Sequence, residues 1–198
     1  MALHYSNVTV IGPRRDAVEA WVRSTRRRAW LSPTVRRTTT VFDAECDSLS
    51  TAAIEDFVIE ISADLGCTAF AVLNDGDTLL MYWLAEDGAL LDSFLRARQT
   101  RGGNARRLSH SLGGDRHIVH ELLHGDLPQP REIQHLRLVH APIARAKHLH
   151  NQLVEALGLP DYGVDRSWSS LECGDAKAGW QRVGDSDRGR LPEYLRLV

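Results

Sequence analysis

The chain has 198 residues, of which 43% are hydrophobic and 25% are charged, as expected for a globular protein with a sizeable core. Its formal net charge is −2, which excludes a strong overall attraction to nucleic acid or to anionic membranes. No apolar run approaches the length of a membrane span, and the first residues lack the pattern of a signal peptide. The three cysteines are widely spaced and form no CxxC pair, which favours a cytoplasmic protein without disulfides.

Residues 1–65 alternate between strand-like and helix-like patterning. In chain order the predicted elements are 8–11 (strand), 14–27 (helix), 29–32 and 38–43 (strands) and 51–65 (helix). The helix at 51–65 has the clearest pattern, because apolar residues recur at i, i+3, i+4 and i+7 while acidic residues occupy the other face. Gly66 predicts its end, since glycine readily adopts the left-handed conformation that follows many helices.

Residues 67–95 predict three antiparallel strands joined by two tight turns. Residues 67–73 and 78–84 are apolar runs of strand length, and the Asn-Asp-Gly-Asp sequence between them is typical of a hairpin turn. A Glu-Asp-Gly sequence then precedes a third strand at 89–95. The resulting order βαββαβββ predicts an α+β fold with a mixed or antiparallel sheet and helices packed on one side of it.

The second half of the chain reads as helical. Residues 96–114 contain five arginines and four glycines without a clear period, which predicts a flexible loop. That loop would separate a sheet domain (1–95) from a helical C-terminal subdomain (115–198) packed on it. Within the subdomain the apolar spacing predicts helices at 115–124, 131–139 and 143–157.

One motif is typical of a specific reaction, because His120, Glu121 and His124 form H-E-x-x-H on the predicted helix 115–124. In zinc peptidases the two histidines lie one helical turn apart and bind the metal, and the glutamate activates a metal-bound water. This interpretation makes the protein a zinc-dependent hydrolase, with His120 and His124 as metal ligands and Glu121 as the catalytic base.

A catalytic zinc site also needs a third protein ligand, which the motif does not supply. In the extended form of the motif the third histidine is replaced here by Pro130. His148 and Glu155 on the predicted helix 143–157 are the remaining candidates, but neither belongs to a recognisable second motif.

We therefore interpret the motif as the solvent-facing side of an amphipathic helix. With nine histidines in the chain, an H-E-x-x-H sequence arises by chance in roughly 2–3% of chains of this composition. The opposite face of this helix carries the apolar residues Ile118, Val119, Leu122 and Leu123. Burial of these four residues is reason enough for the helix to form, so we expect no bound cofactor.

Acidic residues gather at two further kinds of place. Asp43, Glu45 and Asp47 follow a predicted strand, and Asp75, Asp77, Glu86 and Asp87 lie in the hairpin turns. Together they could hold Mg²⁺ or Ca²⁺ if the strand end lies beside a turn. Acidic residues are also preferred in turns for purely local reasons, and the spacing matches no EF-hand loop. No phosphate-binding glycine motif and no G-x-S-x-G motif is present.

Four segments resemble a family of uncharacterised small bacterial proteins. They are TVFDAECD (40–47), AVLNDGD (71–77), YWLAEDG (82–88) and LVEALGLP (153–160). These motifs are turns and core elements rather than catalytic signatures. The resemblance implies a bacterial α+β protein and implies no activity and no site residue.

These observations lead us to expect a non-enzymatic binding or interaction module with a protein partner, which it regulates or, if the partner is a toxin, neutralises. Two alternatives stay open. The first is the zinc hydrolase based on His120, Glu121 and His124. The second is a nucleic-acid binder that uses the arginines of residues 96–107, although that segment lacks the interleaved aromatic residues on which bases stack.

Overall fold

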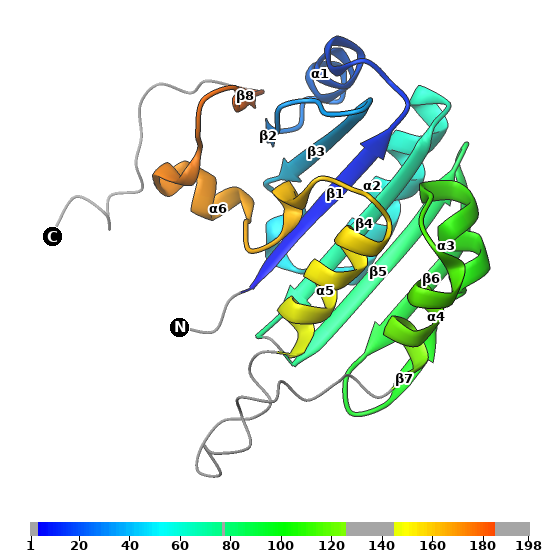
Figure 1. Ribbon diagram of the computed structural model, residues 1–198. Coiled ribbons are helices and arrows are strands. Elements are labelled where there is room, and N and C mark those ends of the chain that lie inside the picture. The colour runs from blue at the N-terminus through cyan, green and yellow to red at the C-terminus, as the bar shows by residue number, and fades with distance from the viewer. Residues whose placement is uncertain (1–3, 77, 126–144, 185–198) are drawn as a thin grey trace, which may run out of the picture.

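The computed structural model describes residues 4–76, 78–125 and 145–184. In these ranges the strands form an eight-stranded antiparallel sheet in the order β7-β6-β5-β4-β1-β3-β2-β8 (Figure 1). In chain order they are β1 (Tyr5–Ile11), β2 (Ala29–Leu31), β3 (Thr38–Asp43), β4 (Thr68–Asp75), β5 (Leu79–Glu86), β6 (Ala89–Arg96), β7 (Thr100–Gly102) and β8 (Gln181–Val183).

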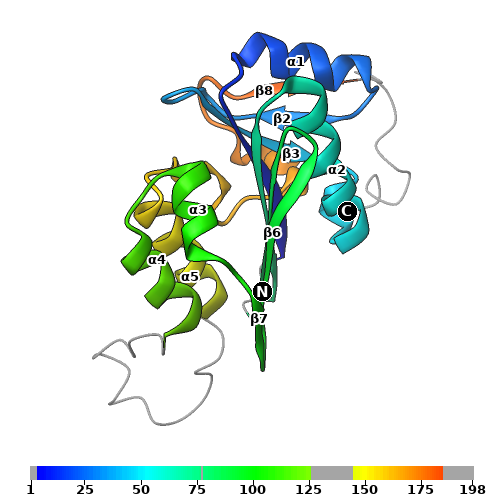
Figure 2. The ribbon, with the colours of Figure 1, turned by 90° about the vertical axis from the view of Figure 1, so that its right-hand side faces the viewer.

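Helices cover both faces of the sheet, as Figure 2 shows with the sheet seen edge-on. One face carries α1 (Arg15–Ser24) and α2 (Thr51–Leu65), and the other carries α3 (Ala105–Leu112), α4 (Arg116–His124) and α5 (Arg145–Ala156). Shorter helical turns are η1 (Cys46–Ser48), η3 (Asp161–Gly163), α6 (Trp168–Ser170) and η4 (Leu171–Asp175). The fold is α+β, as predicted, with its layers in the order helix, sheet, helix.

The predicted meander and the helix beneath it are confirmed. β4, β5 and β6 are consecutive antiparallel strands, with Phe70 opposite Leu84 and Tyr82 opposite Phe94. α2 packs on all three strands. The side chain of Ser50 accepts a hydrogen bond from the Ala53 amide at the start of α2, and Gly66 ends the helix with φ of 54°.

The sheet has two separate apolar cores because its central strands are apolar on both faces. Along β4, Ala69 and Ala71 join the cluster under α1 and α2, whereas Phe70 and Val72 join the cluster under α3, α4 and α5. Alternate side chains of a strand point to opposite faces, so such a strand needs cover on both. The first two helices do share one side, and the helices of the second half take the other.

Residues 96–114 include two elements where the sequence analysis expected a loop. β7 pairs with the end of β6, and α3 follows it. α3 begins at Asn104, whose side chain accepts hydrogen bonds from the amides of Arg106 and Arg107. Ala105 and Leu108 are buried at i and i+3, a short apolar pattern that the surrounding arginines obscure in the sequence.

The last described residues form the edge of the sheet opposite β7. β8 pairs with β2, so that Val183 lies opposite Ala29. The helix predicted at 131–139 lies outside the described residues. No helix in the described ranges is both long and apolar enough to cross a membrane.

Candidate functional site

α4, the helix that carries the H-E-x-x-H motif, is fixed by ordinary helix capping at both ends. The Asp115 side chain accepts hydrogen bonds from the amides of His117 and Ile118 at the N-terminus, at 2.7 and 3.3 Å. At the C-terminus the Arg96 guanidinium donates to the carbonyls of the last turn and of Gly125, at 3.1 to 3.4 Å. The guanidinium of Arg96 is therefore occupied at the C-terminus of α4, and Arg96 is not counted among the free cations of this region.

His120 and His124 lie side by side on the exposed face of α4. Their ring centroids are 5.1 Å apart. Nδ1 of His120 is 4.0 Å from the Glu121 carboxylate, and Nε2 of His124 is hydrogen-bonded to the Gly103 carbonyl at 2.9 Å. More than half of the His120 and Glu121 side-chain surface is exposed, at 59% and 66%. One imidazole nitrogen of the pair, Nε2 of His124, thus already has a backbone hydrogen-bond partner.

The structure does not bring a third ligand to this pair within the described ranges. His148 and Glu155 are exposed on α5, whose opposite side packs into the core through Leu149 and Leu153. Among described residues no group of three or more His, Cys, Asp or Glu side chains is placed to hold a metal ion.

The apolar side of α4 is narrower than the sequence indicated. Val119 and Leu123 are fully buried, whereas Leu122 is half-buried and Ile118 is 53% exposed. The prediction that Ile118 is buried was wrong. α4 contacts α3 and α5 on the side that carries Val119 and Leu123. Ile118 and Leu122 each precede one of these residues and are therefore turned about 100° away from the contact.

Two of the acidic residues that sequence analysis considered as Mg²⁺ or Ca²⁺ ligands, Asp43 and Asp47, accept hydrogen bonds from backbone amides. The Asp43 carboxylate accepts hydrogen bonds from the amides of Glu45 and Cys46, and the Asp47 carboxylate accepts from the first amides of α6. Burial raises the pKa of the Asp43 carboxyl above its ordinary value, although Arg27 lies 3.6 Å away. Asp43 thus caps its own turn, as the local interpretation expects, whereas Asp47 binds α6, 121 residues further along the chain.

A basic surface lies at the β7 end of the sheet. Residues 96–124 contain six arginines against Asp115 and Glu121, a formal charge of +4 in a chain whose total is −2. We call its exposed cationic and imidazole side chains the basic edge. They belong to the β6–β7 turn, β7, α3 and α4: Arg98, Arg101, Arg106, Arg107, Arg116, His110, His117, His120 and His124.

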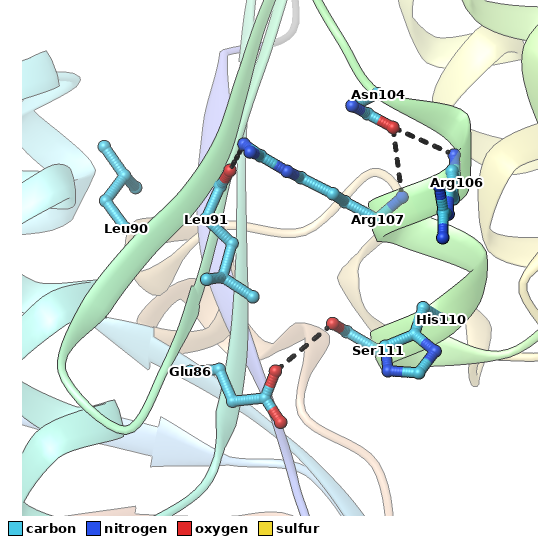
Figure 3. A pocket seen from close by; sticks show the side chains of 8 residues that line it. All are labelled: Glu86, Leu90, Leu91, Asn104, Arg106, Arg107, His110 and Ser111. Atoms are coloured by element: carbon cyan, nitrogen blue, oxygen red, sulfur yellow. Dashed lines mark hydrogen bonds between the residues drawn. The ribbon is translucent and has the colours of Figure 1, made fainter.

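Part of the basic edge forms the wall of an open hollow of about 510 Å³ between the start of β6 and α3 (Figure 3). The strand side supplies Glu86, Leu90 and Leu91, and the α3 side supplies the remaining lining: Asn104, Arg106, Arg107, His110 and Ser111. Arg107 spans the hollow and donates a hydrogen bond to the Leu91 carbonyl. At the other end Ser111 Oγ donates to the Glu86 carboxylate at 3.4 Å.

A second set of hydrogen bonds fixes the position of α3 above this hollow. The Asp92 carboxylate on β6 accepts from the Tyr82 hydroxyl and from the Asn104 amide, both at 2.7 Å. The start of α3 is thereby tied to β5 and β6. Sequence analysis missed this site because it placed the arginines in a loop; the available signal was Asn104 as a helix cap followed by Ala105 and Leu108.

Comparison with protein-family models, with curated proteins and with solved structures gives no match to this chain. No family model therefore supports the resemblance noted from the sequence.

Proposed function

We propose that the protein is a binding module whose basic edge recognises an acidic surface of a partner protein, and that it acts by binding rather than by catalysis. The observation that carries this proposal is that residues 96–124 hold five exposed arginines with no carboxylate at ion-pair distance in the described part of the chain. In the other basic segment, residues 14–37, several arginines already pair with carboxylates. Clustered like charges repel each other in the free protein. A complementary surface relieves that repulsion, accelerates encounter and selects the partner.

Two properties of the basic edge favour a protein partner over nucleic acid. Residues 96–124 contain no Phe, Trp or Tyr, so the edge lacks the aromatic platforms on which bases stack. The hollow in its wall is also lined by Leu90 and Leu91, apolar surface that suits a peptide, whereas arginine itself binds carboxylates and phosphates alike. Occupation of a partner's acidic surface suits the regulatory or toxin-neutralising role expected from the sequence.

The test compares two triple variants with the same total charge. In the first variant, glutamate replaces Arg98, Arg101 and Arg116. In the second variant, glutamate replaces the exposed residues Arg14, Arg26 and Arg36. Binding of fluorescein-labelled polyglutamate is followed by anisotropy at several NaCl concentrations. We expect at least a tenfold loss of affinity in the first variant and little change in the second. Equal losses would contradict a localised site, and tighter binding of single-stranded DNA than of polyglutamate would favour the nucleic-acid alternative.

The zinc hydrolase is retained as a second candidate because the His120 and His124 rings are adjacent on one exposed helix face. In that role Glu121 would be the base. Its test is the zinc content of protein purified without chelator or metal-affinity tag, with His120→Ala as the site variant and His117→Ala as the control. About one zinc per chain, lost in His120→Ala and kept in His117→Ala, would favour the hydrolase over the binding module.

A further inference from the structure

The outer edge of β6 is only partly covered. β7 pairs with β6 at Phe94, Leu95 and Arg96, and the sheet order ends at β7. The Ser93 carbonyl accepts a hydrogen bond from the Gly103 amide at 2.9 Å, so in the described part of the chain residues 89–92 of β6 are the ones without a neighbouring segment on their outer side. The register with β5 also shifts here: Leu84 pairs with Asp92 and Ala85 with Leu90, so Leu91 is the extra residue of a bulge.

The hollow described above opens onto this uncovered edge. Leu90 and Leu91 both line it, and Figure 3 shows their side chains on opposite sides of the β6 ribbon. Lining from both sides of a strand means that the hollow faces the strand's edge rather than one face of the sheet. Leu90 is 39% exposed there, although it is a large apolar residue.

In the free protein Arg107 occupies the position that a neighbouring strand would take. Its guanidinium donates to the Leu91 carbonyl, a group that points away from β5 toward the hollow. Charged side chains at an exposed strand are a common protection against unwanted pairing. Because Arg107 is itself exposed, an incoming amide can replace it at the carbonyl, which frees the guanidinium for a carboxylate.

We propose that residues 89–92 of β6 take up an extended, acidic segment of the partner protein as an additional strand. This inference rests on the proposed function and assigns its mode of binding. Backbone hydrogen bonds to β6 would supply affinity, and carboxylates on the segment would meet Arg106, Arg107 and His110. Such strand addition is a general mode of peptide recognition. A strand rises about 3.3 Å per residue, so residues 89–92 span roughly 10–13 Å and accommodate roughly three to four residues of the segment.

Charge decides against a second copy of this chain as the occupant. A symmetric edge-to-edge dimer would place the same surface of both copies at one interface. The hollow carries Arg106 and Arg107 against the single carboxylate of Glu86, which already accepts from Ser111, so two copies would bring together an excess of positive charge. The backbone edge and the apolar surface of Leu90 and Leu91 fit a peptide, whereas a nucleic acid would offer phosphates without strand-forming amides.

The experiment uses two fluorescein-labelled peptides of identical sequence and charge, in which Glu and Val alternate. The second peptide is N-methylated at alternate residues, so that it keeps its carboxylates and loses the amides that a strand must donate. We expect the unmodified peptide to bind at least tenfold more tightly. We also expect it to slow hydrogen exchange of the β6 amides at 89–92, and its affinity to fall at least tenfold in Arg107→Glu. Arg101→Glu, in the basic edge but outside the hollow, should change the ratio between the two peptides by less than twofold.

The outcomes separate this inference from the proposed function. Equal binding of the two peptides that is lost when Arg98, Arg101 and Arg116 are reversed would overturn strand addition and leave the basic edge as the binding surface. Absence of binding by either peptide at low salt would contradict both. Displacement of the unmodified peptide by an equal charge of single-stranded DNA would overturn the peptide as occupant, as would a concentration-dependent dimer lost in Arg107→Glu.

Discussion

The hydroxyl of Tyr5 on β1 and Nδ1 of His150 on α5 are hydrogen-bonded at 2.8 Å inside the protein, and their rings stack with centroids 5.6 Å apart. Both side chains are buried, at 1% and 2% exposure. The pair ties the helical layer of the second half to the first strand of the chain. Burial lowers the pKa of His150 to about 3, so the imidazole is neutral in the folded protein at neutral pH.

This pair predicts a loss of stability in acid. The folded pKa of His150 lies below the ordinary value of about 6.5, so between pH 6.5 and 3 the unfolded chain binds more protons than the folded chain. The free energy of unfolding should therefore fall as pH drops through this window. We expect the His150 contribution to lower it by about 2 kcal/mol between pH 7 and pH 5.

Urea unfolding at the two pH values measures this effect, with His150→Gln as the comparison because glutamine keeps a hydrogen-bonding group and does not titrate. The wild type should lose about 2 kcal/mol more than the variant over that interval. Parallel losses in the two proteins would show that other groups carry the acid sensitivity.

The two faces of α4 predict a contrast within one helix. Leu123→Ala removes a fully buried side chain and should lower the free energy of unfolding by about 3 kcal/mol. Ile118→Ala, at a position 53% exposed, should change it by less than about 0.5 kcal/mol. Denaturant unfolding of both variants checks the contrast, and a large effect of Ile118→Ala would mean that this face of α4 is covered.

The cap of α3 predicts a local effect on the hollow. Asn104→Ala removes the acceptor for the amides of Arg106 and Arg107 and should cost about 1 kcal/mol of stability. Hydrogen exchange should accelerate at these two amides. Asn104→Asp keeps an acceptor and should preserve protection, so equal exchange in the two variants would argue against the cap.

Two neighbouring glycines between α3 and α4 predict different responses to the same substitution. Both have positive φ, 94° at Gly113 and 90° at Gly114. A Cβ at Gly114 would lie 2.2 Å from the Ala156 carbonyl oxygen of α5, whereas at Gly113 the nearest atom is at 3.8 Å. Gly114→Ala should therefore destabilise the protein by about 1–3 kcal/mol more than Gly113→Ala. Equal unfolding midpoints for the two variants would contradict this close approach of α5.

Local signals in the sequence predicted the first 95 residues well. Periodicity and turn residues encode the order βαββαβββ, the ends of α2 and the meander β4–β6. They do not encode pairing between distant segments. The positions of β1 between β4 and β3, and of β8 beside β2, depend on contacts across the whole chain. The distribution of helices over the two faces also follows from packing rather than from periodicity.

The candidate site was less accessible to sequence reasoning, for identifiable reasons. The arginines of α3 obscured its apolar spacing in the sequence, because the buried side of this helix consists of Ala105 and Leu108 alone. The H-E-x-x-H motif pointed to His120 and His124, whereas the uncovered edge of β6 has no residue signature because its feature is backbone without a neighbouring strand. His150 was missed as well, although it shares a helix face with Ala146 and Leu153.

The pairing of β8 with β2 has a consequence for synthesis of the chain. Ala29 and Leu31 form the β2 edge early, but Val183 and Gln181, which cover it, leave the ribosome only after most of the protein has been made. At ordinary rates of translation the interval is roughly ten to thirty seconds. During that time the nascent sheet presents an open strand, so a stalled or prematurely terminated chain would be prone to associate with others through β2.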